Sequence, residues 1–181
     1  MPIVDARVVI VWATASGSSI NTADIQFDDA VLDYDAAAEA VGTAIEDSFL
    51  LQLTDNLRLA EVKVGDDVVG GSYQSNTFGG TPGAGTNPSV AFGFTKQVGS
   101  GRNGRWYVPG VAEAFVDDKG RLTTAAVDAL NGNLVTMLAD LATAGVTLTV
   151  KQKLGNYQPV AAMSCRNFVT LQRRRLDRAR G

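Results

Sequence analysis

The 181-residue sequence contains no histidine and a single cysteine, and it has no long apolar run. Without histidine the chain lacks the commonest general base and metal ligand, so a Ser-His-Asp triad is impossible. Cys165 alone cannot form an internal disulfide, and its apolar neighbours favour a place in the core. No stretch approaches the roughly 18 to 20 apolar residues that cross a bilayer. We therefore expect no enzymatic activity, no cofactor, no metal and no membrane partner.

Charge is distributed unevenly along the chain. Residues 1–67 hold thirteen acids and three bases, whereas residues 166–181 hold six arginines and one acid. We call residues 173–181 the arginine tail; its basic residues are Arg173, Arg174, Arg175, Arg178 and Arg180. Arginine pairs well with both carboxylates and phosphates. Three interpretations stay open: contact with an acidic surface of a neighbouring copy, contact with nucleic acid, or a solvated tail that aids solubility.

Hydrophobic periodicity predicts an α+β fold. β-branched or alternating runs predict strands at 7–13, 20–27, 57–64, 146–154 and 160–172. Apolar residues at helical spacing predict helices over 35–53 and from about 123 to 144, with Asp35 as one N-cap and Thr123 or Thr124 as the other. We expect a mixed or mainly antiparallel sheet with two helices packed on one face. This single domain would span residues 1–172, with the arginine tail following it.

Two segments fit no element. Asp24–Asp35 holds five acids without the spacing of a calcium loop, so we interpret it as a solvated acidic loop. Residues 68–87 are rich in glycine, serine and threonine and predict a long loop or mobile arm. Tyr73 and Phe78 give such an arm side chains that could anchor it in a neighbouring molecule. The alternative is a plain surface loop.

Pro88–Gly110 predicts a β-hairpin, because two strand-like runs flank the polar link Gly99–Gly104. This link matches G-x-G-x-x-G, but a β-prone run ended by proline follows where a dinucleotide site needs a helix. The glycines are therefore interpreted as turn residues. Arg102 and Arg105 would lie at or beside the tip and extend a basic surface. Trp106 and Tyr107 could stack on bases or pack in a core or interface.

Two strings carry a resemblance to a known class of proteins. The strings Gly101–Gly110 and Phe168–Leu176, with the helix between them, resemble small uncharacterised virion structural proteins of bacteriophages, whether coat, capsid-associated or tail proteins. The resemblance implies no enzymatic activity, synthesis in the host cytoplasm and a final place in a virus particle. The partners it implies are further copies of the chain, and either viral nucleic acid or other virion proteins.

The leading hypothesis is a non-enzymatic viral structural protein that self-assembles as a homo-oligomer. The alternative is a nucleic-acid-binding module that uses the arginine tail together with Arg102 and Arg105. The sequence leaves open whether the protein forms a shell or belongs to a tail or connector.

Overall fold

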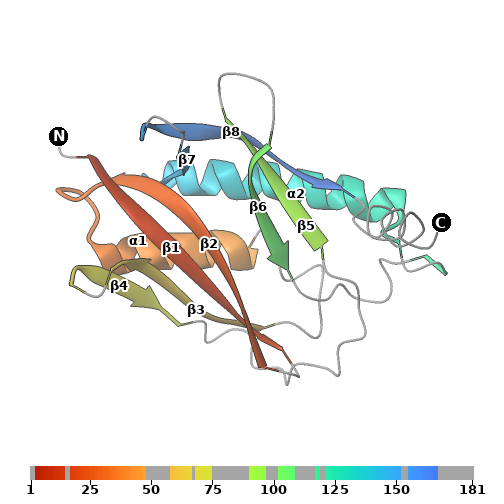
Figure 1. The fold of residues 1–181 in the computed structure, drawn as a ribbon, viewed down its shortest axis with the longest axis horizontal. Coiled ribbons are helices and arrows are strands. Elements are labelled where there is room, and N and C mark those ends of the chain that lie inside the picture. The colour runs from red at the N-terminus through yellow and green to blue at the C-terminus, as the bar shows by residue number, and fades with distance from the viewer. Residues whose placement is uncertain are drawn as a thin grey trace, which may run out of the picture.

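The computed structural model describes residues 3–14, 17–47, 58–66, 68–74, 90–96, 102–108, 117–118, 121–151 and 155–166, and for 90–96 and 102–108 it describes the backbone. In chain order the elements are β1 (Ile3–Thr14), β2 (Gly17–Asp28), α1 (Tyr34–Ile45), β3 (Arg58–Gly65), β4 (Gly70–Tyr73), β5 (Val90–Lys96), β6 (Arg102–Val108), α2 (Thr124–Thr143), β7 (Thr147–Lys151) and β8 (Tyr157–Arg166). The strands form one eight-stranded antiparallel sheet in the order β4-β3-β1-β2-β7-β8-β5-β6. Both helices lie on the same side of the strands (Figure 1), which confirms the predicted α+β fold.

The first two strands are longer than the sequence predicted. β1 and β2 pair over their whole length, from Ile3 opposite Asp28 to Thr14 opposite Gly17. Alternate residues of β1 are buried, among them Val8 and Ile10, as expected of a strand with one face on a core. The extra length comes from this pairing, which satisfies backbone groups in stretches that lack a strong apolar pattern.

Helix α1 begins at Tyr34, inside the segment that was expected to be an acidic loop. Asp33 is the N-cap, and its side chain accepts a hydrogen bond from the backbone N–H of Ala36 at 2.7 Å. The prediction of Asp35 as N-cap was wrong. Asp35 lies inside the first turn and accepts from the backbone N–H of Ser72 in β4 at 2.9 Å. The described helix ends at Ile45, and the predicted extension over 48–53 lies outside the described residues.

The start of the predicted arm is a strand of the sheet. β4 pairs with β3 from Gly65 opposite Gly70 to Val62 opposite Tyr73, so residues 70–73 are not part of a loop. Gly71 lies directly against the N-terminus of α1: a Cβ built there would be 2.2 Å from the carbonyl carbon of Tyr34. The glycines allow this close approach, and their composition misled the sequence interpretation. Residues 75–87 lie outside the described residues.

The predicted hairpin within Pro88–Gly110 is confirmed as β5 and β6. Its register runs from Val90 opposite Val108 to Thr95 opposite Arg102, with an irregularity between Phe94 and Thr95. Gly104, which was expected in the turn, pairs with Phe94 beside this irregularity and so lies within the edge strand. Strand β6 therefore begins inside the link that was expected to be the turn.

The sheet curls strongly at its β6 end. Cα atoms of β6 come within 8 Å of Cα atoms of β2 and β7. In a flat sheet β6 would lie four strand spacings, or about 19 Å, from β2. The β5–β6 hairpin thus turns back toward the first half of the chain, beside β2 in the view of Figure 1.

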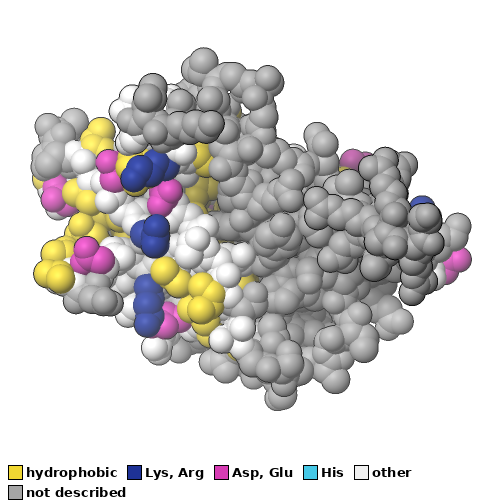
Figure 2. Space-filling model, viewed as in Figure 1, with side chains coloured by type: hydrophobic (Ala, Val, Ile, Leu, Met, Phe, Trp, Pro, Cys, Tyr) yellow, Lys and Arg dark blue, Asp and Glu magenta, His cyan; other side chains and the backbone are white. Residues whose placement is uncertain are grey.

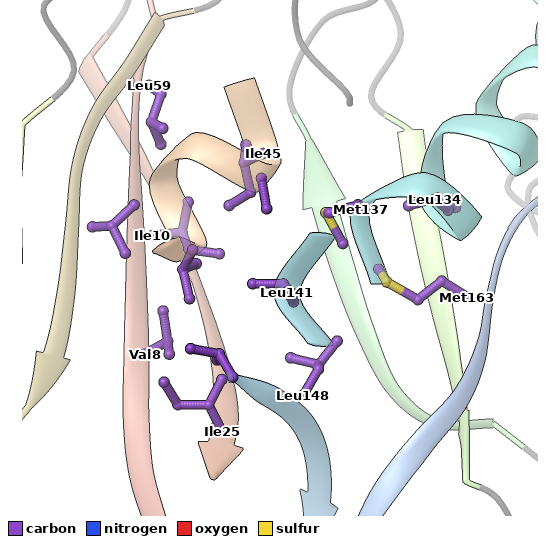
Figure 3. Packing of buried hydrophobic residues seen from close by; sticks show 14 of the residues in the cluster. Val8, Ile10, Ile25, Ile45, Leu59, Leu134, Met137, Leu141, Leu148 and Met163 are labelled. Carbon is purple, nitrogen blue, oxygen red and sulfur yellow. The ribbon is translucent and has the colours of Figure 1, made fainter. Parts of the chain in front are cut away.

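One hydrophobic core joins the two halves of the chain. Figure 3 shows Ile45 of α1 and Met137 and Leu141 of α2 converging with strand residues that include Ile10 and Met163. Helix α2 begins at the predicted N-cap Thr123, whose hydroxyl accepts from the N–H of Ala126 at 3.2 Å. The chain leaves α2 through Gly145, whose φ of +81° suits glycine.

Candidate functional site

The basic residues predicted in the hairpin lie on one edge strand. Within β6, Arg102 pairs with Thr95 and Arg105 with Gly93, while Trp106 and Tyr107 pair with Phe92 and Ala91. Arg102 begins the strand, close to where it was expected. Arg105 lies well inside the strand, so its predicted place at or beside the tip was wrong. The arginine tail and Phe78 lie outside the described residues.

Tyr73 does not belong to an exposed arm. Its ring packs against α1 at Gly42, where a Cβ would come within 2.2 Å of the ring. The phenol oxygen donates a hydrogen bond to Glu46 Oε2 at 3.0 Å. The prediction that Tyr73 anchors in a neighbouring molecule is therefore corrected: within the chain it ties β4 to the end of α1.

The Tyr73–Glu46 pair is only partly satisfied. Glu46 is 6% exposed, and its Oε1 has no hydrogen-bond partner within the described part of the chain. Burial of the tyrosine raises its pKa above 10, and the hydrogen bond to Glu46 raises this pKa further. The neutral phenol is therefore the form that the fold stabilises, and the pair acts as a structural link between helix and strand.

A second acidic feature lies between the helices, and we call it the α1–α2 groove. It is a recess of about 390 Å³. Its floor consists of Ala36, Ala40 and Ala44, which recur every four residues along α1. Its rim carries three exposed acids: Glu39 from α1, Asp47 just after the end of α1, and Asp140 from α2. Among the described residues that line this groove there is no lysine or arginine.

The opposite side of the molecule carries both signs of charge. Figure 2, which looks onto the strands, shows basic and acidic side chains interspersed over its described part. Lys63 and Glu61 of β3 form an ion pair there at 3.2 Å. Exposed pairs of this kind contribute little to stability. The strand face thus mixes both signs of charge, whereas the charged side chains among the described residues that line the α1–α2 groove are all acidic.

Several acids of the first third bind backbone amides. Asp33 caps α1 and Asp35 holds β4, as described above. Asp66 accepts from the N–H groups of Val68 and Val69, and these hydrogen bonds lower its pKa. The predicted acidic loop is wrong at Asp24 and Asp28, which lie in β2, and at Asp35, which lies in α1. Asp33 and Asp35 are exposed, as predicted, and each also makes a structural contact.

The remaining chemistry of the described residues is sparse. Cys165 is buried beside α2, and burial raises the pKa of its thiol to about 12, so the thiolate is not available near neutral pH. The described residues contain no group of three or more histidine, cysteine or acidic side chains placed to hold a metal. None of the described helices has the length and apolar character to cross a membrane.

The α1–α2 groove is the site that the sequence did not predict. Its residues come from two helices about a hundred positions apart, and alanines every fourth residue predict only a helix. Comparison of the chain with protein-family models, curated proteins and solved structures found no match. The geometry alone offers an acidic recess suited to a cationic group and a sheet that ends in a basic strand.

Proposed function

We propose that this protein is a non-enzymatic structural subunit that self-assembles into a virus particle. The observation that carries the proposal is the pair of open ends of its sheet. Among the described strands, β4 and β6 each pair on one side only. The resemblance to bacteriophage virion proteins is the reason why we propose a virus particle as the assembly. The protein would be made in the host cytoplasm and end in the virion.

An open edge strand presents unpaired N–H and C=O groups along one side. Such an edge can accept a strand from another molecule, and two edges on one molecule allow the contact to repeat. On β4 the N–H of Ser72 already donates to Asp35, so a contact there would use the remaining backbone groups of the strand. Strand β6 carries Arg102 and Arg105, whereas Asp35 and Asp66 lie beside β4 and its turn. Contacts between β6 and β4 of successive copies would therefore join edges of opposite charge.

The test is the mass of the purified full-length chain over a range of concentrations and salt, together with electron micrographs at high concentration. We expect discrete oligomers, rings, tubes or shells that grow with concentration. A chain that stays monomeric at every concentration and salt would refute the proposal. Reversing the charge of β6 with Arg102→Glu and Arg105→Glu tests whether that edge is used, because its contact with the acids beside β4 would then become repulsive.

A nucleic-acid-binding module is the second candidate, and the density of arginines favours it. Five of the nine residues of the arginine tail are arginine, and Arg102 and Arg105 share β6 with Trp106 and Tyr107. Gel-shift affinity for single- or double-stranded nucleic acid should fall steeply as salt rises. Full affinity after removal of residues 173–181 would refute this candidate.

A further inference from the structure

We propose that the α1–α2 groove receives the arginine tail of a second copy of this chain, so that copies join head to tail. This inference rests on the proposed self-assembly and names the surfaces that one contact would use. The tail contains Leu176 and Ala179 among its five arginines. Its chemistry, apolar stems with cationic ends, matches a groove with an alanine floor and an acidic rim.

The charges favour this occupant over a phosphate-bearing one. Glu39, Asp47 and Asp140 border the groove, and no basic residue is among the described residues that line it. Guanidinium groups bind carboxylates with paired hydrogen bonds, whereas phosphates would meet repulsion from all three acids. Both helices end without a basic residue in the last turn, so the negative ends of their dipoles add to the attraction.

The direction of the chain favours a second copy over the same copy. The N–H of Cys165, at the end of β8, donates to Asn131 Oδ1 in the first half of α2 at 2.8 Å. Asp140 lies nine residues further along α2, about 14 Å away along the helix axis. The chain enters β8 near the groove end of α2 and leaves it heading away from the groove. At Arg166 the described chain thus points away from its own groove, which favours the groove of another copy.

Charge reversal in the full-length chain tests the contact. The groove variant Glu39→Lys with Asp47→Lys should weaken self-association about tenfold or more, because attraction becomes repulsion at two exposed positions. The matched control is Asp29→Lys with Asp128→Lys, which changes the net charge equally at exposed positions outside the groove. It should leave association within about twofold of wild type. Adding Arg174→Glu with Arg178→Glu to the groove variant should restore association.

Cysteine pairs then report which copy the tail meets. Ala40→Cys on the groove floor with Leu176→Cys in the tail should give disulfide-linked dimers and longer ladders under mild oxidation. Ile20→Cys with Leu176→Cys is the control, since Ile20 is 61% exposed on β2. The buried Cys165 should not compete. A disulfide within one chain, or equal ladders from both pairs, would overturn the inference.

The two proposals fail separately. If the wild type assembles and the groove variant assembles equally well, the groove assignment is wrong while self-assembly stands. If the wild type is monomeric under all conditions, self-assembly itself is wrong and the inference falls with it. If the groove variant is no weaker than the control variant, net charge and not the groove governs association, which also overturns the inference.

Discussion

Replacing Gly71 by alanine should separate β4 from α1. The added Cβ would lie 2.2 Å from the carbonyl carbon and 2.4 Å from the carbonyl oxygen of Tyr34. Carbon atoms in contact normally lie about 3.5 to 4 Å apart, so the strand or the helix must move by more than about 1 Å. Because these atoms belong to the backbone of a capped helix, no side-chain rotation can relieve the clash.

Moving β4 away from α1 lowers the free energy of unfolding in two ways. Overpacking of this kind costs about 1 to 3 kcal/mol. The movement also stretches the hydrogen bond from the N–H of Ser72 to Asp35, and a hydrogen bond to a charged group contributes about 1.5 to 3 kcal/mol. The two costs overlap, since moving the strand relieves the clash. We therefore expect Gly71→Ala to lower the free energy of unfolding by at least about 2 kcal/mol.

Urea denaturation followed by far-UV circular dichroism measures this change. Hydrogen exchange adds a local readout, because the amide of Ser72 should lose its protection. The matched control is Gly132→Ala in α2, where a Cβ meets no atom within 4 Å. That variant should raise stability by about 0.5 to 1 kcal/mol, the usual gain for alanine over glycine inside a helix. If Gly71→Ala stays within about 0.5 kcal/mol of wild type, the packing of β4 on α1 is wrong.

The other predictions concern a helix cap, a partly buried phenol and a thiol. Thr123→Ala should cost about 1 kcal/mol in urea denaturation through loss of the α2 cap, and Thr123→Ser should restore most of it. Tyr73→Phe should lower the free energy of unfolding by about 1 to 3 kcal/mol at neutral pH, because Glu46 Oε2 loses its hydrogen-bond donor. The pKa of Tyr73 in the folded state lies above 10, so its contribution to the free energy of unfolding is complete below pH 10 and is lost as pH rises through the folded pKa. The Tyr73→Phe variant should therefore lose less stability at high pH than the wild type does. Cys165 should react with a thiol reagent at pH 8 only after unfolding; rapid labelling of the native protein would contradict its burial.

The sequence predicted the features that depend on local chemistry. Thr123 could be identified because a threonine followed by a helical apolar stripe is a capping signal. The hairpin within Pro88–Gly110 could be identified because its flanking strands are apolar and the proline after it excludes a helix. In both cases the residues that decide the structure are neighbours in the chain.

The missed features depend on contacts between distant segments. Gly70 and Gly71 have the composition of a flexible linker, yet Gly71 is required where β4 touches α1. Asp33 and Asp35 both fit a helix start, and only the position of Ser72 decides which one caps and which one holds the strand. The α1–α2 groove exists only because the core brings two helices together.

The fate of the acids links the fold to the proposed assembly. Asp33, Asp35 and Asp66 accept from backbone N–H groups, and these bonds add no positive charge. Folding therefore uses these carboxylates without neutralising them, and the first third of the chain keeps its negative charge. The five arginines of the arginine tail lie at the other end of the sequence, after β8. The proposed head-to-tail contact would place the arginine tail of one copy against the acids of the next. The separation of negative and positive charge along the sequence would then stabilise the assembly.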